Sequence, residues 1–122
     1  MSISLREEAG GKVLVIRLGG KLTKSDYERF VPEVERLGRR HGKVRLLIQM
    51  HDFHGWSMSA PWDDIRLDLK HLTCIERLGL VGESKWEAGM AAFCEPFTSA
   101  TRCFFDEDKA GESLKWINGE IT

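Results

Sequence analysis

Two histidines with an aspartate between them form the one group in this sequence that resembles a metal or acid–base site. His51 and His54 flank Asp52 in a stretch that follows an apolar segment. Imidazole and carboxylate groups bind metals such as zinc and exchange protons in catalysis. Such a site needs a third group, and none stands out in the sequence. We therefore expect these histidines to bond the backbone of a polar loop. We assign no catalytic residue, metal or cofactor, and we expect a non-enzymatic protein.

Aromatic and methionine side chains gather in the same stretch, namely Phe53, Trp56, Met58 and Trp62. Such side chains suit a binding site for an apolar ligand. The alternative is that they fill the core between a helix and a sheet. Trp62 fits a helical stripe and suits either interpretation. Trp56 and Met58 precede that stripe and favour a binding site.

Two other sequence patterns could indicate a binding site, but each is explained more simply by the end of a helix. Gly79 to Ser84 places a glycine and a helix start after a strand, but it lacks both G-x-x-x-x-G-K-[ST] and G-x-G-x-x-G. We expect a capped helix there rather than a nucleotide site. Cations crowd residues 36–41, where they complement the end of a predicted helix, although an anionic-ligand patch is the alternative.

Length and charge narrow the class of protein. The 122 residues suit one domain spanning 1–122. Lys and Arg total 18 against 19 Asp and Glu, so the strongly basic balance of a nucleic-acid-binding domain is missing. The odd set Cys74, Cys94 and Cys103 indicates reduced thiols and a cytoplasmic protein. No stretch is apolar over the roughly 18 residues that a membrane span needs, so any membrane contact would be peripheral.

Hydrophobic periodicity predicts strands alternating with helices. The predicted strands are 3–8, 12–18, 44–50, 75–81 and 101–105. Gly10 and Gly11 turn the first strand into the second, and Thr23 or Ser25 opens a helix that ends at Gly42. Three further helices are predicted, around the stripe Trp62, Ile65, Leu69 and Leu72, after Ser84 with the stripe Trp86, Met90 and Phe93, and after Asp106 or Asp108.

The order β-β-α-β-α-β-α-β-α predicts an α/β single domain. We expect a mainly parallel five-stranded sheet with an antiparallel first strand and helices mostly on one face. Ligands of such sheets gather outside the carboxyl ends of the strands. The loops predicted there are 19–23, 51–59 and 82–84. Residues 56–72 would form either a movable lid over the ligand site or an ordinary core helix.

Motifs along nearly the whole chain resemble those of one family. They are Leu22 to Tyr27, Phe53 to Ser57, Lys85 to Glu87, Phe104 to Asp106 and Leu114 to Ile117. Together they are similar to the SpoIIAA-like family of small bacterial proteins. The fold of that family resembles the STAS domain of anti-sigma-factor antagonists and, more distantly, Sec14-type lipid-binding domains.

This resemblance implies a regulatory or ligand-binding domain that holds an apolar or amphipathic, lipid-like small molecule near the second and third helices. The expected ligand-binding residues are Phe53, Trp56, Met58, Trp62, Ile65, Trp86 and Met90. Peripheral membrane contact, a regulatory protein partner and a homodimer are further expectations; no nucleic-acid partner is expected.

The alternative function is a protein-interaction switch that is phosphorylated before the second helix. STAS antagonists carry a phosphoacceptor motif of the Asp-Ser-Ser/Thr-Gly kind there. In this chain the candidate acceptors are Ser57 and Ser59, but the acidic residue and the following glycine are missing. This departure ranks the switch below ligand binding.

Overall fold

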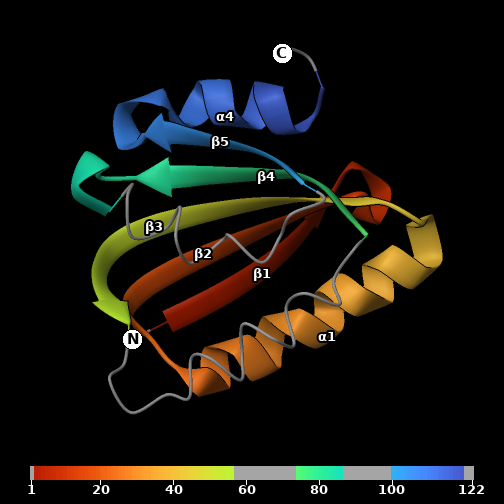
Figure 1. The fold of residues 1–122 in the computed structure, drawn as a ribbon, viewed down its shortest axis with the longest axis horizontal. Helices are drawn as coiled ribbons and strands as arrows, with labels where there is room; N and C mark the ends of the chain where they lie inside the picture. Colours follow the sequence, from red (N-terminus) through yellow and green to blue (C-terminus); the bar gives the residue numbers. More distant parts are fainter. Residues whose placement is uncertain (1, 57–73, 87–99, 120–122) are drawn as a thin grey trace.

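Five strands form one sheet in the computed structural model, which describes residues 2–56, 74–86 and 100–119. The strands are β1 (Ser2–Glu8), β2 (Val13–Leu22), β3 (Val44–Trp56), β4 (Ile75–Gly82) and β5 (Thr101–Asp106). They lie side by side in chain order, as Figure 1 shows. β1 is antiparallel to β2, and the other pairs are parallel. The predicted α/β fold with an antiparallel first strand is confirmed.

The two described α-helices lie on opposite faces of this sheet (Figure 1). They are α1 (Lys24–His41) and α4 (Ala110–Ile117), and three short 3₁₀ turns accompany them, η1 (Ala9–Gly11), η2 (Ser84–Trp86) and η3 (Glu107–Lys109). The sequence also predicts that most helices lie on one face of the sheet. That prediction involves the helices expected within 57–73 and 87–99, which lie outside the described residues. Among the described residues, no helix is both long and apolar enough to cross a membrane.

Each face of the sheet has its own apolar core, because successive side chains of a strand point to opposite faces. Leu46 and Ile48 of β3 pack with Val34 and Leu37 of α1. Leu47, between them in sequence, packs on the other face with the α4 core. β3 is therefore buried on both sides and is the central element of the fold.

The start of α1 is set by Thr23. Its hydroxyl accepts a hydrogen bond from the backbone N–H of Asp26 at 3.4 Å, and the Asp26 carboxylate accepts one from the backbone N–H of Thr23 at 2.9 Å. This reciprocal capping box settles the choice between Thr23 and Ser25. The helix continues through Pro32 and ends at Gly42, whose φ of 82° suits a glycine.

Cys74 and Cys103 are half-buried free thiols. Burial raises the pKa of both thiols, so less of each is present as the nucleophilic thiolate at neutral pH. Cys94, the third cysteine of the sequence, lies outside the described residues.

Replacing Thr23 by Val should lower the free energy of unfolding by about 1 kcal/mol, because the helix loses its N-cap acceptor while the β-branched shape is kept. Urea denaturation followed by circular dichroism measures this change. Ser25→Ala is the control and should cost much less, since Ser25 makes no capping bond in the part of the chain that the structure describes. Equal losses in the two variants would contradict the assignment.

Candidate functional site

β3 does not end at Met50 as the sequence analysis expects. It continues through His51 to Trp56, and β2 likewise continues to Leu22. The extension pairs Gly20 with Phe53 and Leu22 with Trp56. The predicted loops over 19–22 and 51–56 are therefore wrong, because the two segments satisfy their backbone groups by pairing with each other.

Irregular backbone makes this extension feasible. The register of β2 and β3 shifts on both sides of Gly20. Gly20, Asp52 and Gly55 have positive φ values of 71°, 50° and 99°. Such angles bulge and twist the ladder without ending it, and glycine adopts them most readily. The bulges redirect the side chains at the carboxyl end of β3.

Phe53 and Trp86 meet at the carboxyl ends of β3 and β4. Their ring centroids are 5.1 Å apart with an interplanar angle of 79°, an edge-to-face contact. Phe53 is only 4% exposed, whereas Trp86 is half-buried against the same core. A Cβ on Gly55 would lie 3.6 Å from Cη2 of Trp86, so the backbone of β3 passes close to the indole. Two residues predicted to bind a ligand are thus adjacent.

Gly82, at the end of β4, allows the Met50 side chain to pack directly against the backbone. A Cβ at Gly82 would lie 2.6 Å from Cε of Met50, nearer than real contacts allow. Met50 therefore packs where a side chain of Gly82 would stand. Met50 belongs to the same buried core as Phe53, and Trp86 packs against that core.

One charged pair, Lys85 and Glu83, lies beside the Trp86 ring. The Lys85 ammonium lies 5.6 Å from the centroid of the Trp86 ring and 3.3 Å from the Glu83 carboxylate. A cation over an indole face is favourable. This edge therefore combines an apolar surface with a polar rim.

The predicted metal candidates lie exposed at the same strand end. His51 and Asp52 are 3.5 Å apart, with side chains 72% and 83% exposed, and His54 is also exposed. Within 2–56, 74–86 and 100–119, no group of three or more His, Cys, Asp or Glu could hold a metal ion.

Most of the other predicted ligand-binding and phosphoacceptor residues lie beyond the described part of the chain. Trp56 ends β3, where its backbone pairs with Leu22. Outside the described residues are Ser57, Met58, Ser59, Trp62, Ile65 and Met90. The lid predicted over 56–72 lies almost entirely outside them as well, and so does the predicted helix after Ser84, apart from its first residues, which form η2.

A hollow at the carboxyl edge of the sheet was not predicted from the sequence. It has a volume of about 470 Å³ and is lined by Ser84, Phe104, Phe105, Asp106, Lys109 and Glu112. It opens where β4 and β5 end, so the strand-end rule could have found it through Asp106. Its charges are mixed, and they indicate no single class of ligand.

Comparison with known proteins finds a matching family and a similar solved structure. A protein-family model described as SpoIIAA-like matches residues 13–118. The crystal structure of an uncharacterised protein from Shewanella loihica PV-4, of the DUF3478 family with a SpoIIAA-like fold, matches with a TM-score of 0.65. That protein is 28% identical in sequence, and the match covers 95% of this chain and 92% of the other. No curated protein matches the chain.

Gly55→Ala should lower the free energy of unfolding by about 1–3 kcal/mol, because the φ of 99° is strained for any residue with a Cβ. The loss should be accompanied by a changed near-ultraviolet signal from Trp86, which packs on this glycine. Gly111→Ala is the matched control: it adds a methyl group into open space in α4 and should be neutral or stabilising. A neutral Gly55→Ala would contradict the described end of β3.

Proposed function

The chain belongs to the SpoIIAA-like family, and on that basis we propose that it is a non-enzymatic module that binds an apolar or amphipathic small molecule. The ligand lies at the carboxyl ends of β3 and β4, against Trp86. The observation that carries this proposal is the edge-to-face pair of Phe53 and Trp86.

The two aromatic rings have different roles in this proposal. Phe53 is buried in the α1 core and holds its partner in place. Trp86 keeps part of its surface accessible, so a ligand can cover it without repacking the core. A rigid aromatic surface offers a large contact area at little cost in conformational entropy.

The polar rim favours an amphipathic ligand over a purely apolar one. Lys85 lies beside the Trp86 ring, where its ammonium can bind the carboxylate of a fatty-acid-like molecule. The Glu83 carboxylate already neutralises part of that charge. Because Lys85 is exposed, its contribution is screened by salt, and the apolar contact supplies most of the affinity.

The alternative switch through phosphorylation of Ser57 or Ser59 stays a prediction, since both residues lie outside the described part of the chain. The predicted regulatory partner, peripheral membrane contact and cytoplasmic location also stay predictions. No described residue favours one of them over ligand binding.

Titration with dansyl-labelled undecanoic acid, followed by the fluorescence of the dansyl group, tests the proposal. Wild-type protein should bind the probe saturably. Trp86→Ala should weaken binding roughly ten- to hundredfold, about 1.5–3 kcal/mol, because the apolar contact is lost. Lys85→Ala should weaken it less, and only at low salt.

Trp116→Phe provides the control, because it changes a tryptophan on the opposite face of the sheet and keeps an aromatic ring in that core. It should leave the dissociation constant unchanged. The proposal fails if wild-type protein does not bind the probe, or if Trp86→Ala binds it as tightly as wild type while remaining folded by circular dichroism.

A further inference from the structure

β1 forms one edge of the sheet, and the hydrogen bonds of β2 show which backbone groups of β1 face outward. The backbone N–H of Arg45 in β3 donates a hydrogen bond to the backbone carbonyl of Lys12, next to the start of β2, at 2.9 Å. Even-numbered residues of β2 therefore direct their backbone groups toward β3, and odd-numbered residues direct theirs toward β1. The antiparallel register pairs odd residues of β2 with even residues of β1, for example Val15 with Arg6. The even residues of β1 are thus bonded inward.

The backbone groups of Ile3, Leu5 and Glu7 consequently point away from the sheet. One of them already has a partner: the Arg29 guanidinium of α1 donates to the Ile3 carbonyl at 3.3 Å. No described residue outside the strand hydrogen-bonds the backbone of Leu5 or Glu7. An edge of this kind is a template for another strand.

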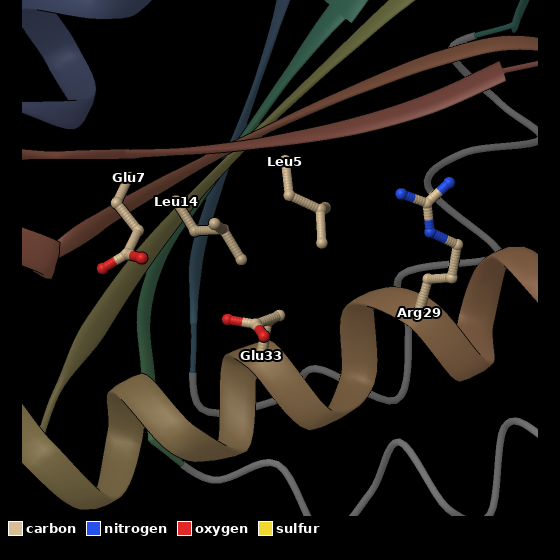
Figure 2. Close-up of a pocket in the computed structure, with 5 residues that line it drawn as sticks. All are labelled: Leu5, Glu7, Leu14, Arg29 and Glu33. Atoms are coloured by element: carbon tan, nitrogen blue, oxygen red, sulfur yellow. The ribbon is translucent and has the colours of Figure 1, made fainter.

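A hollow of about 370 Å³ lies beside this edge, between β1, β2 and α1. It is lined by Leu5, Glu7, Leu14, Arg29 and Glu33, as Figure 2 shows. It exists because α1 packs mainly on β2 and β3 rather than on β1. Leu5, which is half-buried, lies in the middle of the open edge.

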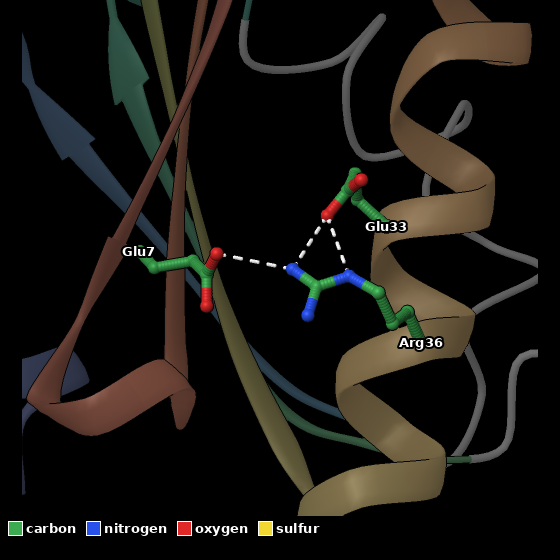
Figure 3. Close-up of polar contacts among 3 residues, drawn as sticks. All are labelled: Glu7, Glu33 and Arg36. Atoms are coloured by element: carbon green, nitrogen blue, oxygen red, sulfur yellow. Dashed lines mark hydrogen bonds and ion pairs between the residues drawn. The ribbon is translucent and has the colours of Figure 1, made fainter.

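Opposite charges stand at the two ends of the edge. At one end, Nη2 of Arg36 lies 3.0 Å from Oε2 of Glu7 and 2.7 Å from Oε2 of Glu33, so Glu7 is held in place (Figure 3). The neighbouring carboxylates, Glu33 first, raise the pKa of Arg36, which stays charged. At the other end Arg29 is bound to Ile3. An edge that is negative at one end and positive at the other is complementary to a copy of itself turned by 180°.

We propose that β1 pairs antiparallel with β1 of a second copy of this chain, about a two-fold axis at Leu5. Ile3 then lies opposite the partner's Glu7, and Leu5 lies opposite the partner's Leu5. Arg29, beside Ile3, reaches the carboxylate of the partner's Glu7, and the same contact repeats across the axis. The two sheets become one continuous sheet.

Strand overlap and charge favour the axis at Leu5 over the other possible registers of the two β1 strands. In β1, only odd-numbered residues have backbone N–H and C=O groups that face outward. The register between two β1 strands can therefore change only in steps of two residues. The axis at Leu5 overlaps all of Ser2–Glu8. An axis at Arg6 would set two Arg6 side chains opposite each other, and like charges there are unfavourable. A strand this short forms a small interface, so we expect a concentration-dependent dimer.

Sedimentation velocity at increasing protein concentration tests the proposal. The wild-type chain should shift from monomer to dimer within the micromolar to millimolar range, and more so at low salt, since the ion pairs are screened. Leu5→Lys should weaken dimerisation tenfold or more, because two ammonium groups would face each other at the axis. Thr101→Lys, the same kind of change on the exposed edge strand β5, should have no effect. A wild-type chain that stays monomeric throughout, or a Leu5→Lys variant that dimerises as strongly as wild type, would overturn the proposal.

Crosslinking gives a second readout that does not depend on the stability of a charged variant. Across such a pair the Cα atoms are about 5.5 Å apart, which a disulfide can span. Oxidised Leu5→Cys should therefore form a covalent dimer faster than Thr101→Cys, with the wild-type chain as background for its native cysteines. Equal rates for the two variants would show random collision and would count against the two-fold axis.

Discussion

The pairing of β2 with β3 beyond Met50 is the interaction on which the candidate site depends. Without it, residues 51–56 would leave the sheet, and Phe53 would lose the register that points its ring into the α1 core. The positive φ values of Gly20, Asp52 and Gly55 keep the ladder going through the bulges. Phe53 is therefore held by the strand and not by a loop, and its ring has a fixed position against Trp86. A site built on a strand is held more precisely than one built on a loop.

The two faces of the sheet separate a structural tryptophan from an accessible one. On the α4 face, Trp116 is buried and packs on Phe105 with ring centroids 5.8 Å apart. The Arg77 guanidinium lies 5.2 Å from the centroid of the Trp116 ring and donates a hydrogen bond to the backbone carbonyl of Trp116. The Arg45 guanidinium donates a hydrogen bond to the backbone carbonyl of Ile117 at 3.0 Å. Both arginines bind carbonyls at the end of α4, where the helix dipole is negative. The indole of Trp116 is thus committed to holding α4, whereas Trp86 retains accessible surface.

Strong periodicity and caps made much of the fold predictable from the sequence. Val44 to Met50 alternate as expected, and Gly42 ends α1. The end of β3 was not predictable in this way, because His51, His54 and Gly55 have the composition of a loop and their pairing with β2 is a long-range event. Phe53 could be selected by residue type, but its contact with Trp86 depends on that pairing. The outward groups of β1 likewise depend on a register that periodicity does not supply.

Nuclear Overhauser effects between dodecanoate and isotope-labelled protein show directly whether an apolar chain binds against Trp86. We predict contacts from the ligand methylene groups to the indole protons of Trp86, weaker contacts to Phe53, and none to Trp116. Contacts confined to Trp116 or to the hollow beside Leu5, with Trp86 unaffected at saturating dodecanoate, would contradict this prediction.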